Sequence, residues 1–376
     1  MNKKYSLVAM LLLGITSLFS QNFTVDGNIR LGYQNHKTDT TTTKQDSIGG
    51  KLHIESKVIN NISAGATFYT TNKISHDKAV GVNFLDSNYD SYSILGEAYL
   101  KGKFKNTTIK LGRQELDTPF ADTDDIGMIP NTFEAGLLIN KDIQNTTIIF
   151  AKVQKWAGVD TDTPEKFSEL NNKNHLHTLG IIYDGFKDIA LQAWQYNLKD
   201  FKVDKISYFE ASYKTSINDI ALGLGGQYAV QNYSASGEKK ATIAGVTASL
   251  GFEKVGLTLS TSYNKSSDNS AVNGFGGGPF FTSCEHLTLA EVGTDGKASR
   301  VGLELDTTIL GVPNFLLELS KLTLKNSAGT KATEIDFVAS YEINDKLTVD
   351  FIYSDTDDKI NNDKYKNTRV FANYSF

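Results

Sequence analysis

The sequence predicts an all-β fold, a single antiparallel β-barrel whose strands cross a membrane. Apolar and polar residues alternate along segments of about ten residues, the pattern typical of transmembrane barrel strands. Short turns rich in Asn, Asp and Gly alternate with long polar connections. Beyond the first residues of the chain, no stretch is apolar enough to form a membrane helix. We therefore expect about 18 strands, with short turns on one side of the membrane and long loops on the other.

The first predicted strand shows the alternation clearly. Val25, Ile29 and Leu31 fall on one face, and Asn28 and Arg30 fall on the other. Because side chains alternate across a strand, one face meets lipid while the other lines a water-filled lumen. The mean hydropathy of -0.29 agrees with this, since half of the residues in such strands are polar.

The connections support the same count of strands. Eight short turns and nine longer connections join eighteen strands, with a margin of about two, and the strand-like segment 285–290 is kept inside a loop. Proline cannot donate a hydrogen bond to a sheet, so it should avoid strand interiors. All five prolines fall in the predicted connections: Pro119, Pro130, Pro164, Pro279 and Pro313.

The amino terminus predicts export. Lys3 and Lys4 precede a short apolar run, so residues 1–20 are interpreted as a signal peptide and residues 21–376 as one barrel domain. The formal net charge of -5 becomes -7 without these two lysines, which argues against a nucleic-acid partner and favours a lumen that prefers cations. The single cysteine, Cys284, excludes an internal disulfide framework.

The motifs of common enzyme classes are missing from the sequence. There is no G-x-S-x-G, H-E-x-x-H or C-x-x-C pattern, so we predict no catalytic residues and no enzyme. A hydrolase in the outer membrane is kept as an alternative, which would require a nucleophile and a base on the outer rim.

The most distinctive connection is the third long one, which begins near Leu111 and contains Pro119 and Pro130. Strict alternation places Arg113, at its base, on the lipid face. An unpaired Arg near the bilayer midplane costs about 2–4 kcal/mol. We therefore expect a β-bulge at Gly112 or a position for Arg113 near the membrane interface.

This stretch, LGRQELDTPFADTDDIGMIPNTFEAG, resembles the third-loop region of the OprD-type porins, particularly the major outer-membrane porins of epsilonproteobacteria. The segment NGFGGGPFFTSCEH, residues 273–286, resembles a loop of the same family. The last strand, which ends at Phe376, resembles the end of bacterial outer-membrane barrels.

The resemblance implies an eighteen-stranded barrel, often a homotrimer, whose third loop folds inward and narrows the lumen. It makes that loop the pore constriction and suggests Ca²⁺ at Asp122, Asp124 and Asp125; we expect no other cofactor. The constriction residues expected are Arg113 on the basic side and, on the acidic side, Glu115, Asp117, Asp122, Asp124 and Asp125.

Strand alternation alone predicts the charged lining of the rest of the lumen. Opposed rows of both signs would create a transverse electric field that passes hydrophilic solutes. The predicted lining residues are Arg30, Lys51, Glu55, Lys110, Arg300, Glu304, Asp336, Asp350 and Arg369.

We expect a general diffusion porin in the outer membrane of a Gram-negative bacterium. It would be a passive, water-filled channel for ions and small hydrophilic solutes, with a mild preference for cations. The alternatives are the hydrolase and an adhesin or structural barrel; the latter would show little conductance.

Overall fold

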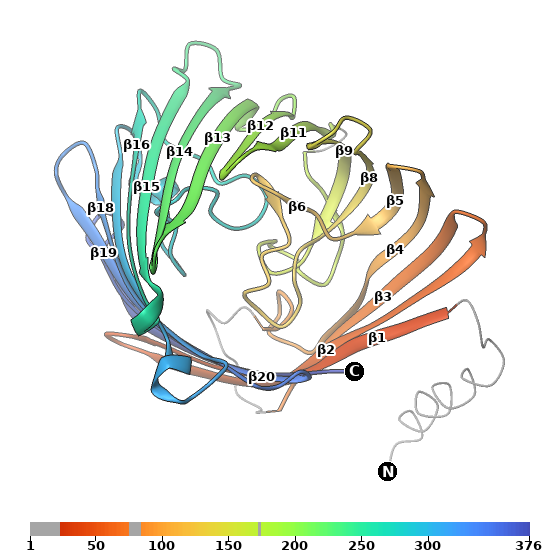
Figure 1. The fold of residues 1–376 in the computed structure, drawn as a ribbon, viewed down its shortest axis with the longest axis horizontal. Coiled ribbons are helices and arrows are strands. Elements are labelled where there is room, and N and C mark those ends of the chain that lie inside the picture. Colours follow the sequence, from red (N-terminus) through yellow and green to blue (C-terminus); the bar gives the residue numbers. More distant parts are fainter. Residues whose placement is uncertain (1–22, 75–83, 172–173) are drawn as a thin grey trace.

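The protein is described by a computed structural model that covers residues 23–74, 84–171 and 174–376. In this part of the chain, eighteen antiparallel strands form a closed barrel (Figure 1). The ring closes where β1 pairs with β21, in a register that runs from Asn28 opposite Ser375 to Thr38 opposite Tyr365. The predicted fold class and strand number are confirmed. The predicted signal peptide lies outside the described residues.

The strands follow one another around the barrel in chain order. No helix among the described residues has the length and apolar character to cross a membrane. The barrel strands are β1 (Phe23–Thr38), β2 (Thr42–Ile59), β3 (Ile62–Lys73), β4 (Tyr92–Phe104), β5 (Thr107–Gln114), β8 (Thr132–Asn140), β9 (Thr146–Ala157), β11 (Leu176–Phe186), β12 (Ile189–Asn197), β13 (Val203–Ile217), β14 (Ile220–Tyr233), β15 (Ala241–Phe252), β16 (Leu257–Ser267), β17 (Lys297–Asp306), β18 (Phe315–Lys325), β19 (Lys331–Asn344), β20 (Leu347–Asp358) and β21 (Asp363–Ser375).

The remaining elements are short and lie in the connections. β10 (Ser168–Glu169) adds to β9, while β6 (Asp117–Thr118) and β7 (Ala121–Asp122) pair only with each other. The described residues also form three 3₁₀ turns, η1 (Glu253–Val255), η2 (Leu289–Val292) and η3 (Thr307–Leu310). The segment 285–290 contains no strand, as predicted.

The outer and inner faces of the strands differ as the alternation predicts. Val25, Ile29 and Leu31 on β1 are 42–49% exposed on the outside, whereas Gln34 on the inner face is 4% exposed. The chain end is tied into the seam, because Gly27 and Phe376 exchange two backbone hydrogen bonds of 3.2 and 3.1 Å. These bonds add to the β1–β21 pairing that closes the barrel.

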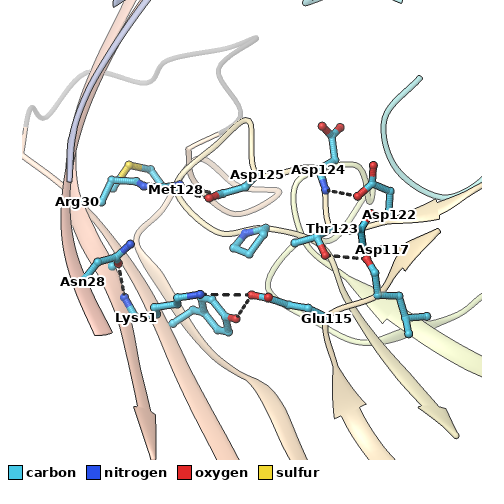
Figure 2. Close-up of a pocket in the computed structure, with 14 residues that line it drawn as sticks. Asn28, Arg30, Lys51, Glu115, Asp117, Asp122, Thr123, Asp124, Asp125 and Met128 are labelled. Atoms are coloured by element: carbon cyan, nitrogen blue, oxygen red, sulfur yellow. Dashed lines mark hydrogen bonds and ion pairs between the residues drawn. The ribbon is translucent and has the colours of Figure 1, made fainter. Parts of the chain in front are cut away.

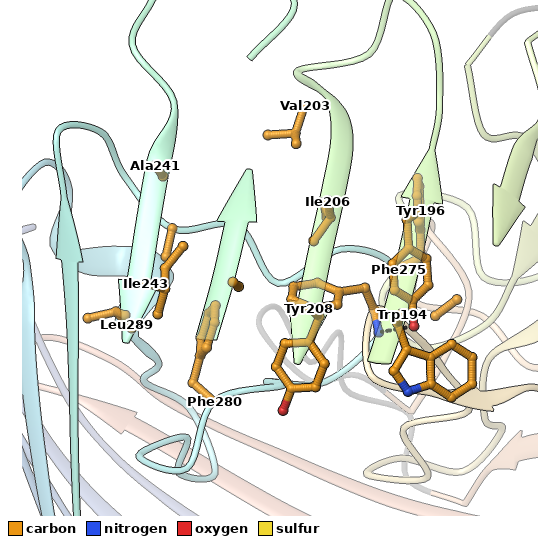
Figure 3. Packing of buried hydrophobic residues seen from close by; sticks show 14 of the residues in the cluster. Trp194, Tyr196, Val203, Ile206, Tyr208, Ala241, Ile243, Phe275, Phe280 and Leu289 are labelled. Carbon is orange, nitrogen blue, oxygen red and sulfur yellow. Dashed lines mark hydrogen bonds between the residues drawn. The ribbon is translucent and has the colours of Figure 1, made fainter. Parts of the chain in front are cut away.

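Part of the lumen is filled by two connections. These are loop 3 (residues 115–131) and loop 7 (residues 268–296), and β6 of loop 3 is visible inside the ring of strands (Figure 1). Loop 7 packs Phe275 and Phe280 against the inner faces of β12, β13 and β15 (Figure 3). The buried core therefore lies inside the barrel. Its wall side chains include Trp194, Tyr196, Ile206, Tyr208 and Ile243.

Loop 3 is anchored to this core by Phe120, which is 2% exposed. Its ring makes edge-to-face contacts with Tyr196, Tyr208 and Phe280, with centroid distances of 5.4, 5.6 and 6.2 Å. Aromatic burial in this geometry adds to the hydrophobic gain. The β6–β7 hairpin is therefore held against the β12–β13 wall.

Loops 3 and 7 are also joined through their backbones. The Asp122 amide donates to the Phe275 carbonyl (2.8 Å), and the Phe275 amide donates to the Phe120 carbonyl (3.0 Å). Gly274 has a φ of +90°, and a Cβ there would lie 2.4 Å from the Phe120 carbonyl oxygen. Only glycine permits this approach without displacement of the backbone.

We predict that Gly274→Ala loosens loop 3 from loop 7, because the added methyl group collides with backbone. The strain should cost about 1–3 kcal/mol and expose loop 3 to an endoproteinase that cuts at Asp. Gly237→Ala is the matched control, since Gly237 has a similar φ of +86° with no atom within 4 Å of the added Cβ. Equal cleavage rates in the two variants would contradict the prediction.

Candidate pore constriction

The far end of loop 3 is fixed to the barrel seam by two arginines. Arg30 on β1 binds both carboxylate oxygens of Asp125 (2.6 and 2.7 Å) and the Gly127 carbonyl (2.6 Å) (Figure 2). Arg369 on β21 donates to the Ile126 carbonyl (2.9 Å). Bidentate Arg–carboxylate pairs are among the strongest and most directional hydrogen bonds in proteins. Loop 3 thus crosses the lumen between the β12–β13 wall and the seam.

A cavity of about 640 Å³ lies between loop 3 and the wall of β1 to β3, and we name it the Arg30 chamber. Lys51 Nζ lies 3.5 Å from Glu115 Oε1, and the Tyr69 hydroxyl donates to the same carboxylate (2.7 Å). The charged lining residues are Arg30, Lys51, Glu115, Asp117, Asp122, Asp124 and Asp125.

A second cavity of about 490 Å³ lies between loop 3, loop 7 and the wall of β17 to β19, and we name it the Asp336 chamber. Asp124 lines both cavities, so the middle of loop 3 separates them. The charged lining residues of this chamber are Asp124, Asp160, Glu285, Glu291, Arg300, Glu318 and Asp336, with His286 beside them.

The barrel end that carries the short turns has a cationic opening of about 680 Å³. Glu55 lies on its wall and accepts hydrogen bonds from Lys101 (2.6 Å) and Tyr99 (2.8 Å). The lysines of this opening are Lys57, Lys101, Lys103 and Lys105.

Asp124 and Asp160 form a buried pair of like charges at the boundary of the Asp336 chamber. Burial raises the pKa of Asp124 to about 7, and the neighbouring Asp160 adds to this effect. Burial also raises the pKa of Asp160, against the Asn131 amide, which donates to its carboxylate (2.6 Å). Two adjacent buried carboxylates resist simultaneous ionisation, so the pair holds a proton near neutral pH.

The predicted acidic residues of loop 3 come together in space. Glu115, Asp117, Asp122, Asp124 and Asp125 all line the Arg30 chamber. Their role in selectivity stays a prediction.

The predicted lining residues are spread over the barrel. Arg30 and Lys51 line the Arg30 chamber, Arg300 and Asp336 line the Asp336 chamber, and Glu55 lines the cationic opening. The other four are placed as follows: Lys110 lies 3.1 Å from Glu97, Asp350 accepts from Ser340 (2.6 Å), Glu304 is exposed and Arg369 is buried beneath loop 3.

Arg113 requires a correction, because it lines neither chamber. It lies 3.7 Å from Glu134, donates to the Leu95 carbonyl (3.3 Å) and stacks over the Phe167 ring at 4.3 Å. The register of β5 is continuous through Gly112, so the expected bulge there is absent from the β4–β5 and β5–β8 pairings. Arg113 keeps its outward parity, and its charge is balanced by Glu134 rather than by a turn into the lumen.

The predicted transverse field also needs refinement. Arg30 and Asp125 do not face each other across open space but are in direct contact, as are Lys51 and Glu115 at 3.5 Å. Within each pair the opposite charges offset each other, and both pairs hold loop 3 in place.

The proposed Ca²⁺ ligands are divided in the same way. Asp125 binds Arg30, whereas Asp124 faces Asp160. Across the described ranges, no three His, Cys, Asp or Glu side chains are grouped as a metal site.

Some residues of the site were not predicted from the sequence. Lys101 and Lys103 follow Tyr99 at a two-residue period, so alternation alone would have placed them in the lumen. Asp160 comes from the connection between β9 and β11, and no spacing in the sequence connects it with Asp124.

A closed barrel with a lumen narrowed by an inward loop defines the class of protein as an outer-membrane channel for small solutes. The family model described as outer membrane porin, OprD family, matches residues 70–323. The chain belongs to this family. It is therefore an integral outer-membrane protein, and its family and fold are those of a non-enzymatic channel.

Solved structures show the same fold at low sequence identity. The crystal structure of Pseudomonas aeruginosa OpdK with vanillate has a TM-score of 0.81 and 18% identity, covering 94% of this chain and 98% of that one. A BenF-like porin from Pseudomonas fluorescens Pf-5 has a TM-score of 0.82 and 16% identity, with coverage of 95% and 99%. Acinetobacter baumannii OccAB4 has a TM-score of 0.80 and 17% identity, with coverage of 95% and 98%. No curated protein sequence matches the chain.

We predict that the cation preference of the channel increases as the pH rises through about 7. Asp124 has a raised pKa, so it is neutral below that pH and adds a negative charge to the lumen above it. The reversal potential in a salt gradient, measured from pH 5.5 to 8.5, reports this change.

Asp124→Asn should remove the pH-dependent step, whereas the control Asp350→Asn, a lumen-facing acid outside loop 3, should retain it. A cation preference that stays constant or falls across this range in the unmodified protein, measured with EDTA present, would contradict the prediction.

Proposed function

We propose that the protein is a passive, water-filled channel for ions and small hydrophilic solutes, with a mild preference for cations set at loop 3. The observation that supports this most directly is the charge of the Arg30 chamber. Its lining carries five carboxylates, Glu115 and four Asp, against the two cations Arg30 and Lys51. A surplus of carboxylates at a constriction attracts cations and repels anions.

The degree of selectivity is a separate part of the proposal. The sequence predicted general diffusion, whereas channels of the OprD family are substrate-specific. We propose that size and charge select the solute at the two chambers beside loop 3, because both chambers are bordered by the packed connections that occupy part of the lumen. The cationic opening at the other end, of about 680 Å³, lies outside the two chambers.

We also propose Ca²⁺ as an ion that the acidic part of loop 3 can hold. Of the three ligands expected from the sequence, Asp122 and Asp124 remain available, whereas Asp125 binds Arg30 and is replaced here by Asp160 of the connection between β9 and β11. Carboxylate oxygens are the ligands that Ca²⁺ prefers, and a bound cation would offset the repulsion between the Asp124 and Asp160 carboxylates. Bound Ca²⁺ would keep both carboxylates ionised and mask the pH-dependent step described above until EDTA is added. If EDTA does not alter the pH-dependent change in cation preference, the Ca²⁺ proposal is wrong.

The resemblance of the two loop motifs supports two finer proposals. The protein would be of the epsilonproteobacterial major-porin type, and it would assemble as a homotrimer after export with removal of residues 1–20. Native mass spectrometry of the detergent-solubilised protein would count the chains and weigh the mature form.

We predict that the purified, refolded protein forms stable conductance steps in a planar bilayer, with a reversal potential that shows cation preference. Asp122→Asn combined with Asp124→Asn should shift the reversal potential toward zero, because two of the five chamber carboxylates are lost. Glu304→Gln is the control, since it removes an exposed lumen-side acid from outside loop 3.

A reversal potential that shows anion preference would still support a channel, but it would show that the Lys and Arg side chains of the wall, rather than loop 3, set the selectivity. The absence of any steps, from protein that still shows the heat-modifiable mobility of a folded barrel, would overturn the channel function.

A further inference from the structure

The Asp336 chamber carries a large surplus of negative charge. Arg300 is the one Lys or Arg among its described lining residues, and it pairs with Glu318. Two of the acids are also satisfied by the protein, because Glu285 pairs with Arg369 and Glu291 accepts from the backbone and hydroxyl of Thr288. The chamber is therefore anionic even after these pairs are discounted.

Asp336 and Ser320 stand out within this chamber. They lie opposite each other in the β18–β19 register, and they are 3% and 2% exposed. Asp336 Oδ1 and Ser320 Oγ have no hydrogen-bond partner among the described residues, and the same holds for Ser283 Oγ, His286 Nε2 and Arg300 Nε of this chamber. The Asp336 carboxylate also lies beside the Cys284 thiol and the Glu334 carboxyl, so only one of its oxygens is left for a further donor. Buried polar atoms are almost always paired in native proteins, so these atoms indicate a missing ligand or solvent.

We propose that the Asp336 chamber binds the primary ammonium group of a small aliphatic amine, held by Asp336 and Ser320. An ammonium has three N–H donors and no acceptor, which suits a site with an excess of acceptor oxygens. Its positive charge offsets the surplus of carboxylates. The proposal rests on the proposed channel function and names a substrate class for it.

The rest of the lining fits the remainder of such a molecule. Ile126 of loop 3 and Val338 of β19 give the chamber apolar surface for a short alkyl chain. The cavity of about 490 Å³ has room for a small solute. An anion would meet the acidic lining unfavourably, and a neutral alcohol would leave its charge uncompensated.

The test is block of the potassium current through single channels by n-butylammonium, with n-butanol and butyrate as probes of equal chain length. We expect n-butylammonium alone to block. Asp336→Asn should raise the half-blocking concentration about tenfold, through loss of one charge-assisted hydrogen bond. The matched control, Asp350→Asn, should leave that concentration unchanged, because Asp350 lines a different part of the wall.

A second variant, Ser320→Ala, provides the same test if Asp336→Asn does not fold. It should also raise the half-blocking concentration of n-butylammonium. Equal block by n-butanol, or block that neither variant weakens, would overturn the proposal while steps in potassium chloride still support the channel. If the protein shows no steps at all, saturation-transfer NMR with n-butylammonium in detergent tests the site directly, and no signal would overturn it.

Discussion

The crossing of loop 3 through the lumen is the constraint on which the rest of the structure depends. At one end Phe120 is buried among aromatic rings of the wall and of loop 7. At the other end Arg30 and Arg369 bind the turn around Asp125. An apolar anchor supplies most of the free energy of docking, whereas the arginine pairs supply direction. Together they divide the lumen into two chambers.

This division changes what the charged residues do. Arg30 and Lys51 are wall cations, yet both are engaged by acids of loop 3, so they hold the loop rather than project a field. The charge that a solute meets is then set by carboxylates without such a cation, and the Asp124–Asp160 pair adjusts it with pH. Some acids of loop 3 therefore hold the loop in place, whereas Asp124 sets the charge that a solute meets.

The fold could be predicted from the sequence because a membrane barrel repeats a local rule. Alternation, turn residues and proline placement each act over a few residues, so strand number and the inward faces of Arg30, Lys51 and Asp336 followed from them. The same rule placed Arg113 outward. Of the two alternatives expected for it, the bulge at Gly112 is absent and the interfacial position stays a prediction, and the Glu134 partner on β8 could not be identified before the register was known.

The site was less predictable because it is made by contacts between distant loops. The acidic character of loop 3 was visible in the sequence, but the Phe120–Phe275 pairing and the approach of Asp160 depend on how three connections pack. Gly274 and Gly276 belong to the segment 273–286, which resembles a loop of the family. Their positive φ values show why the motif is needed, since loop 7 runs against the backbone of loop 3 there.

The position of loop 3 across the lumen can be tested by a reversible cross-link between the loop and the seam. Cysteines would replace Arg30 and Asp125 in a Cys284→Ser background and be joined by a short bifunctional thiol reagent that can be reduced. We expect efficient cross-linking, and the same single-channel conductance with the bridge intact as in the unmodified channel, because the loop already lies against the seam. Failure to cross-link, or a bridge that changes the conductance from the unmodified value, would show that loop 3 rests elsewhere.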